Sequence, residues 1–240
     1  DAVAVACHFT DHGKVALEAL RRGIHVFVEK PVANSLGELD AVKEAHRQSG
    51  AHLAAMFGLR CTPWFQTAKR LIGEGAIGEI RLMHAQKSYK LGTRSEVYRT
   101  RDTYCGTIPW VGSHAIDLCY WLSGETFVSV YAAHTSRANR GHGELEMTGL
   151  CQFTFSNEVF GSVSIDYLRP QQASGHADDR IRIAGTEGIL EVRGNRVYLL
   201  GGGDAGEAVD VPQDEGKRIF AEFVRHIRGE GPALVSAEDS

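Results

Sequence analysis

The sequence predicts an α/β protein that begins with a parallel, doubly wound sheet and continues into an α+β domain with an open, mostly antiparallel sheet. Short apolar runs alternate with amphipathic helical segments up to about residue 72, as in chains that form parallel sheets. From about residue 127 to 200, strand-like segments follow one another directly. Turn residues separate these later strands, which indicates antiparallel pairing.

Strands and helices alternate in the first part of the chain. Ala2–Cys7 is a continuous apolar run, which predicts a parallel strand buried on both faces. A helix is expected over Asp11–Arg22, with Gly23 at its C-terminal cap. The next strand is expected over His25–Glu29.

Two further helices carry start signals. Ser35 and Glu38 have the spacing of a capping box, which predicts a helix from Leu36 to about Ser49, stopped by Gly50. Thr62-Pro63 has the pattern of an N-cap and first helical residue, for a helix to about Ile72. A strand over about residues 52–57 lies between them.

The second part has a different pattern. A long strand is predicted over Glu79–Lys90 and a helix over Val111–Ser123, closed by Gly124 and packed on one face of the later sheet. A last helix is predicted over about Glu215–Arg228. We place the domain boundary near Gly75–Gly78, which divides the chain into residues 1–75 and 76–240.

Composition excludes several classes of protein. The chain has 240 residues, 43% hydrophobic and 23% charged, with a formal net charge of -4, so nucleic acid is not an expected partner. No apolar run is long enough to span a bilayer. Five scattered cysteines predict reduced thiols in a cytoplasmic compartment and no zinc site: Cys7, Cys61, Cys105, Cys119 and Cys151.

A glycine-rich motif near the end of the chain is not a phosphate site. Gly201, Gly203 and Gly206 match G-x-G-x-x-G, but the segment that follows is polar, contains Pro212 and starts no helix. It predicts a flexible hairpin or linker loop. The first strand is also followed by no glycine-rich turn, so either this is not a dinucleotide fold or its first strands precede Asp1.

The stretch Glu29-Lys30-Pro31 ends a predicted buried strand, where parallel sheets bind ligands. A lysine held there has a fixed donor direction, and Pro31 restricts the backbone of Lys30. The alternative is a solvated lysine before a turn proline, and these residues alone leave both open. His114 and Asp117 share a helix face, yet a lone helix histidine is more often structural.

Four segments together resemble the Gfo/Idh/MocA family of nicotinamide-dependent oxidoreductases: "GIHVFVEKPVANS", "RLIGEGAIGEI", "GTIPWVGSHAIDLCYWLSG" and "DDRIRIAGTEGILEV". The resemblance implies an N-terminal Rossmann domain, here partial, and a C-terminal substrate and oligomerisation domain. It also implies that family members extend beyond the points matching Asp1 and Ser240. The pyrophosphate loop and the residue that separates NAD from NADP are expected in the preceding segment.

The resemblance also implies residue roles. Lys30 contacts the reacting hydroxyl and His114 is the catalytic base. The expected cofactor contacts are His8, His12, Glu29, Lys30 and Pro31. Arg60 and Asp117 are expected near substrate, with Asp117 alternatively orienting His114. Trp110 stands where many members carry an aspartate, and we expect it to form an apolar wall for substrate.

The sequence does not decide whether eight polar residues are solvated surface positions or substrate contacts: Lys87, Tyr89, Arg94, Arg99, Tyr167, Arg169, His176 and Asp179. Of these, Tyr167 and Arg169 are our predicted substrate ligands.

The resulting hypothesis is an oxidoreductase that uses NAD or NADP to oxidise a secondary alcohol of a sugar, cyclitol or related polyol. A non-catalytic ligand-binding relative is the alternative, favoured by Trp110. A metal-dependent lyase using His142, His176 and Asp178 is disfavoured, because these residues lack recognised ligand spacing. An open sheet with one uncovered face predicts a homodimer or homotetramer, and no membrane partner.

Overall fold

The computed structural model describes residues 1–201, 206–212 and 216–240. These residues form two compact units. The first unit comprises residues 1–58, 101–105 and 217–240, and the second comprises residues 59–100 and 106–216. No helix in the described part of the chain is long and apolar enough to cross a bilayer.

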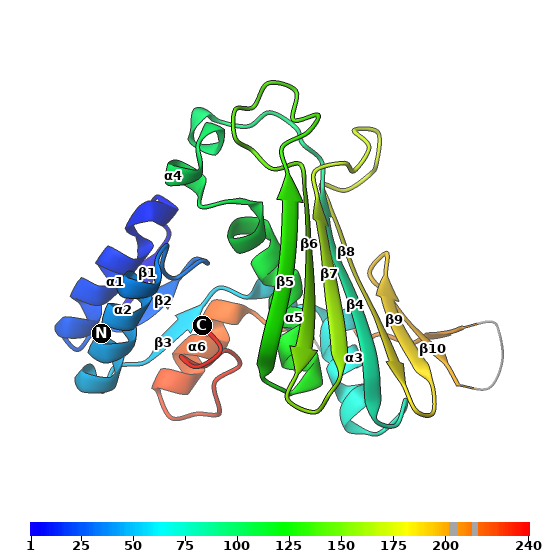
Figure 1. Ribbon diagram of the computed structural model, residues 1–240. Coiled ribbons are helices and arrows are strands. Elements are labelled where there is room, and N and C mark those ends of the chain that lie inside the picture. The colour runs from blue at the N-terminus through cyan, green and yellow to red at the C-terminus, as the bar shows by residue number, and fades with distance from the viewer. Residues whose placement is uncertain (202–205, 213–215) are drawn as a thin grey trace. The chain divides into compact units, whose positions relative to one another are not determined.

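The first unit contains a three-stranded parallel sheet in the order β1-β2-β3 (Figure 1). A 3-10 turn over Phe9–Asp11 follows the first strand. The bounds of its strands and helices are β1 Ala2–Val5, β2 His25–Val28, β3 Leu53–Ala55, α1 His12–Arg21, α2 Leu36–Ser49, α4 Arg101–Tyr104 and α6 Ile219–Ile227.

The core of this unit forms around β2, whose residues Val26 and Val28 are fully buried. Apolar side chains of α1, α2 and α6 pack on the sheet and complete one cluster. The prediction that the first strand is buried on both faces is wrong: Ala2 and Ala4 are exposed, because β1 lies at one edge of this sheet.

The predicted capping signals are confirmed. The Ser35 hydroxyl accepts the Glu38 N–H at 3.2 Å, and α2 ends at Gly50, whose φ is 64°. The Glu38 carboxylate reaches back one residue further than a capping box requires, to the Asn34 N–H at 2.9 Å. Both ends of α2 therefore follow from local sequence.

The second unit is an eight-stranded sheet in the order β11-β10-β9-β8-β4-β7-β6-β5. All its strand pairs are antiparallel except β4 with β7, which are parallel. The strands are β4 Ile80–Tyr89, β5 Phe127–Thr135, β6 Thr148–Phe155, β7 Phe160–Asp166, β8 Ala177–Gly185, β9 Ile189–Arg193, β10 Arg196–Leu200 and β11 Glu207–Val209.

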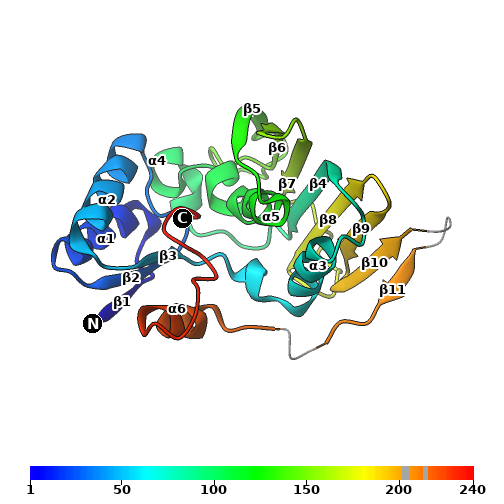
Figure 2. The same cartoon turned by 90° about the horizontal axis from the view of Figure 1, so that it is seen from below.

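Two helices, α3 Pro63–Gly73 and α5 Ser113–Ser123, pack on the same face of this sheet (Figure 2). This confirms the predicted helix on one face. A π-helical turn over Ile108–Gly112 leads directly into α5, which closes at Gly124 with φ 71°. Short 3-10 turns span Gly58–Cys61 and Glu96–Arg99.

The division into units differs from the predicted boundary near residue 75. Helix α3 belongs to the second unit because it packs against α5, β9 and β10. Residues 217–240 belong to the first unit because Phe223 and Val235 are part of its core. The α4 segment also belongs there, since the Cys105 thiol donates to the Asn34 side-chain oxygen at 2.7 Å.

Two elements escaped sequence analysis, and two predicted positions lie outside the described residues. The strand β11 was taken for loop, because it is short and polar, and α4 was taken for part of a polar loop. The last helix begins at Ile219, whereas its predicted first residue, Glu215, lies outside the described residues. Gly203 of the glycine-rich motif also lies outside them.

The face of the second sheet opposite α3 and α5 is open. The register aligns Tyr131, Gln152, Ser162 and His84 across four strands on that face. A groove of about 510 Å³ runs over it, and within the described residues Figure 2 shows no helix on this face. The large apolar side chains exposed there include Tyr131 (67% exposed) and Phe160 (58%).

Three histidines join α6 to the sheet of the first unit. His226 Nε2 lies 3.1 Å from His52 Nδ1, and His226 Nδ1 donates to the Gly231 carbonyl at 3.1 Å. His25 Nδ1 accepts the His52 backbone N–H at 2.9 Å, and the His25 and His52 rings stack. His25 accepts this bond only as a neutral ring, and at least one of the two facing nitrogens of His52 and His226 carries no proton. Burial, with the neighbouring positive groups, lowers the pKa of both His25 and His52.

We expect the first unit to lose stability below the ordinary histidine pKa of 6.5. Because the folded pKa values are lowered, the unfolded chain takes up protons first as the pH falls. The stabilisation is complete above pH 6.5 and is lost as the pH falls toward the folded pKa values. Urea unfolding between about pH 7.5 and about pH 5.5 measures this.

His226→Gln should flatten that pH dependence, because it removes one neighbouring positive charge from His52 and His25. His84→Gln, on the exposed face of the second sheet, is the control and should preserve it. An unfolding free energy of the first unit that does not change over this pH range would contradict the prediction.

Candidate active site

The carboxyl ends of β1 and β2 meet at one edge of the first sheet. Val5 pairs with Val28, and the Glu29 N–H donates to the Val5 carbonyl at 2.9 Å. The segment that starts at Cys7 therefore lies beside the one that starts at Glu29. The edge is where parallel sheets bind ligands.

Side chains fasten these two post-strand segments together. His12 is 1% exposed, and its ring nitrogens lie 2.9 Å from the Pro31 carbonyl and 3.2 Å from the Cys7 carbonyl. The Asn34 amide donates to the Phe9 carbonyl at 2.6 Å. The observed contacts of His12 are thus structural, and its direct contact with a cofactor stays a prediction.

Lys30 is 5% exposed at the end of β2. The Glu29 carboxylate accepts the Lys30 N–H at 2.7 Å and lies 3.9 Å from its ammonium. The peptide bond between Lys30 and Pro31 is cis. A buried ammonium held beside a carboxylate is a directed donor, and of the two alternatives that the sequence left open, its burial excludes the solvated lysine.

His8 lies at the same edge. Its Nδ1 bonds the Thr10 hydroxyl at 2.7 Å, and its ring stacks on Phe9. Its Nε2 is buried with no hydrogen-bond partner among the described residues. Because a buried polar atom without a partner is costly, this nitrogen is fitted to meet a polar group of a bound molecule.

In the second unit, His114 is the second residue of α5 and Trp110 lies in the π-helical turn before it. Glycines allow this turn to press on the sheet. A Cβ at Gly112 would lie 2.4 Å from Ile165 Cδ1, and one at Gly149 would lie 3.1 Å from Ile108 Cγ1. These two close contacts therefore set the distance between the sheet and the first residues of α5.

Glu146 anchors the start of that turn, and sequence analysis missed it. Its carboxylate accepts the Thr107 N–H at 2.7 Å, and its backbone carbonyl accepts the Thr107 hydroxyl at 2.8 Å. The other carboxylate oxygen lies 2.8 Å from His134 Nδ1. A glutamate before an apolar strand carries no local signal of this role.

Asp117 and Arg60 bind each other. The Arg60 Nη2 donates to Asp117 Oδ1 at 2.6 Å, and its Nε lies 3.1 and 3.0 Å from the two carboxylate oxygens. Both side chains are buried, and the guanidinium carbon lies 5.7 Å from the Trp121 ring centre. The structure thus directs Asp117 to Arg60, and contact of either residue with substrate stays a prediction.

The predicted ligands Tyr167 and Arg169 lie at the end of β7. Tyr167 is buried, and the Arg94 guanidinium carbon lies 4.6 Å from its ring centre. Arg169 pairs with Asp178 at 3.1 Å and donates to the Gly175 carbonyl. Most of the eight open positions lie near these two, while Arg99 lies apart, paired with Glu96.

Matches to known families agree with this architecture. Residues 1–57 match the model of an oxidoreductase family with an NAD-binding Rossmann fold. Residues 65–191 match the GFO/IDH/MocA C-terminal domain. The chain belongs to the GFO/IDH/MocA oxidoreductase family, which confirms the resemblance.

Individual relatives of the chain are also named oxidoreductases or dehydrogenases. A solved oxidoreductase structure from Thermotoga maritima is 50% identical, with a TM-score of 0.95, over 100% of this chain and 73% of that one. An uncharacterised oxidoreductase, YrbE, of Bacillus subtilis is 27% identical over 82% of this chain and 56% of its own length. Inositol 2-dehydrogenase 2 of Saccharopolyspora erythraea is 32% identical over 69% of this chain and 47% of its own length. The chain spans about half the length of these two curated relatives.

We expect Asp117→Asn to destabilise the second unit by roughly 3–5 kcal/mol, because it leaves the buried Arg60 guanidinium uncompensated. Urea unfolding measures the loss. Glu74→Gln breaks the exposed pair with Arg70 and is the matched control, with an expected change of about 1 kcal/mol or less. Equal effects of the two substitutions would contradict the prediction.

Proposed function

We propose that the protein is an oxidoreductase that oxidises a secondary alcohol of a sugar, cyclitol or related polyol with a nicotinamide cofactor, NAD or NADP. The observation that carries the proposal is the buried Lys30 at the carboxyl edge of a parallel sheet in this family. The name of the Saccharopolyspora relative, an inositol dehydrogenase, supports the substrate class.

Lys30 and His114 would carry the chemistry. The nicotinamide, when bound, supplies the acceptor for the hydride that leaves the alcohol carbon. Lys30 would donate a hydrogen bond to the reacting oxygen and hold it in one orientation. His114 would accept the hydroxyl proton, a task suited to an imidazole near neutral pH. The Nε2 of His8 and the Glu29-Lys30-Pro31 segment would hold the nicotinamide half of the cofactor.

A non-catalytic, ligand-binding protein is the second candidate. Trp110 favours it, because tryptophan offers an apolar surface and one N–H donor but no carboxylate. The presence of both Lys30 and His114 favours the enzyme, since ligand binding alone requires no proton acceptor. Nicotinamide-linked turnover of any polyol in a broad panel would exclude this second candidate.

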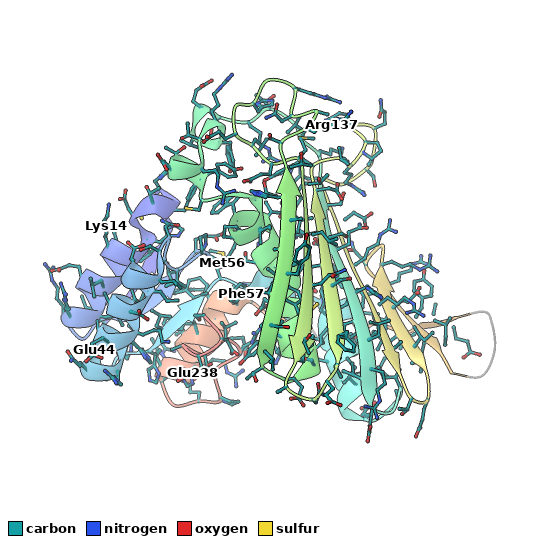
Figure 3. All side chains as sticks on the ribbon, in the orientation of Figure 1. Lys14, Glu44, Met56, Phe57, Arg137 and Glu238 are labelled. Carbon is teal, nitrogen blue, oxygen red and sulfur yellow. The ribbon has the colours of Figure 1, made fainter. Side chains whose placement is uncertain are left out.

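Lys30→Ala should lower kcat by about 10² to 10⁴, the usual contribution of a positioned proton-transfer or donor group. Turnover is followed by nicotinamide absorbance in a chain extended by the relatives' N-terminal nucleotide-binding segment. Lys14→Ala, at an exposed lysine of the same unit (Figure 3), is the control and should leave kcat unchanged. Undiminished turnover in the Lys30 variant would sink the assignment.

The open sheet face supports a homodimer or homotetramer. The groove and the exposed Tyr131, Leu150 and Phe160 form an apolar surface that a second copy of the chain would cover. A second copy related by twofold symmetry would place the same apolar patch of each chain against the other.

The double variant Tyr131→Lys, Phe160→Lys should therefore shift the mass measured by light scattering to that of a smaller species. Two facing copies would bring the introduced ammonium groups into one buried apolar interface. Leu36→Lys, at an exposed leucine of the first unit, is the control and should keep the parent mass. A parent protein that is already monomeric would refute the assembly.

A further inference from the structure

Nine side chains of the second unit form a basic–aromatic cluster. They come from the end of β4, the segment after it, and the connection from β7 into β8. The members are Lys87, Tyr89, Lys90, Arg94, Tyr167, Arg169, His176, Asp178 and Asp179. The strand register brings them together, since Lys87 pairs with Asp179 and Tyr89 with Ala177.

The cluster adjoins the segment that carries His114. Lys87 pairs across the sheet with Ile165, and Ile165 is the side chain against which Gly112 packs. Gly112 precedes His114 by two residues. Lys87 and its partner Asp179 therefore lie on the same face of the sheet as Ile165, the face against which Gly112 packs.

The cluster holds more positive than negative charge. Lys87 pairs with Asp179 at 2.6 Å, and Arg169 pairs with Asp178 at 3.1 Å. The Lys90 ammonium donates instead to the Ala173 carbonyl, and Arg94 Nη2 donates to the Lys90 carbonyl at 3.0 Å. Carbonyl oxygens do not cancel a formal charge, so Lys90 and Arg94 leave a surplus of two positive charges.

The Arg94 guanidinium packs against two aromatic rings and has donor capacity to spare. It lies over the rings of Tyr167 and Tyr98, at 4.6 and 5.4 Å. Its Nε is buried without a hydrogen-bond partner among the described residues. A fixed planar guanidinium is the side chain best shaped to bind a carboxylate or phosphate.

Two further features fit a charged sugar derivative. The Tyr89 and His176 rings stack with centres 4.8 Å apart, and aromatic faces of this kind pack against the C–H faces of sugar rings. Burial and then the charges of Arg94, Lys90 and Lys87 lower the pKa of His176, so His176 adds little positive charge at neutral pH. The surplus therefore resides on Lys90 and Arg94.

We propose that the basic–aromatic cluster binds an oxyanion of the substrate, so that the protein prefers acidic sugars or polyols over neutral ones. The oxyanion is a carboxylate or a phosphate. This inference rests on the proposed function, because it names the substrate class for the same activity.

Titration calorimetry of the 240-residue chain tests the binding, with galacturonate as the carboxylate probe, glucose 6-phosphate as the phosphate probe, and galactose and myo-inositol as neutral probes. At least one acidic probe should bind about tenfold or more tightly than either neutral one, as expected for a charge-assisted hydrogen bond. The acidic probe that binds more tightly identifies the oxyanion. The preference should weaken as salt is added.

Arg94→Gln should remove the preference for the acidic probe. Arg81→Gln, at an exposed arginine near the other end of β4, is the matched control and should retain it. Lys90→Gln is the second variant, and it keeps the test valid if the Arg94 variant fails to fold. Equal affinity for acidic and neutral probes, or a preference that survives both Arg94→Gln and Lys90→Gln, would overturn the proposal.

Turnover separates this inference from the proposed function. In the N-terminally extended chain, equal kcat/KM for neutral and acidic polyols would overturn the inference and leave the oxidoreductase assignment standing. The opposite result is also informative. If an acidic probe binds tightly, Arg94→Gln abolishes that binding, and no probe supports nicotinamide-linked turnover, the oxyanion site would be supported and the oxidoreductase assignment refuted.

Discussion

The bond between Arg60 and Asp117 is the interaction on which the second unit depends. Removing two charges from water is costly, and their mutual contact, at 2.6 Å, offsets much of that cost. The pair ties the segment after β3 to the middle of α5, one turn beyond His114. The orientation of α5 is thus set at its middle by an ion pair and ahead of its first residue by Glu146, which holds Thr107 at the start of the π-helical turn.

Much of the fold could be predicted because its signals are local. Ser35 and Gly50 bound α2, and Gly124 ends α5, through backbone geometry that nearby residues determine. The parallel pairing of β4 with β7 could not be predicted in this way, since strand order depends on contacts between distant segments. The exposure of β1 is a similar case: an apolar run predicts a strand, but its place at the sheet edge decides its burial.

In the candidate site, too, contacts between distant segments were harder to predict than features with a local sequence signal. Lys30 was assigned a role through the family resemblance, because a lysine directly after a buried strand can equally be a solvated residue before a turn. The partner of Asp117 was not recognised, because Arg60 lies 57 residues earlier in the chain and belongs to a 3-10 turn without periodicity. Glu146 was missed for the same reason, and His12 received a ligand role although its ring contacts two backbone carbonyls.

The close approach of Gly112 to Ile165 couples the residues at these two positions. A Cβ at residue 112 would lie 2.4 Å from Ile165 Cδ1, so the end of the isoleucine side chain would have to turn aside to admit alanine. Shortening Ile165 opens the space that a side chain at residue 112 would need. The free energy cost of a larger side chain at residue 112 therefore depends on which residue stands at 165.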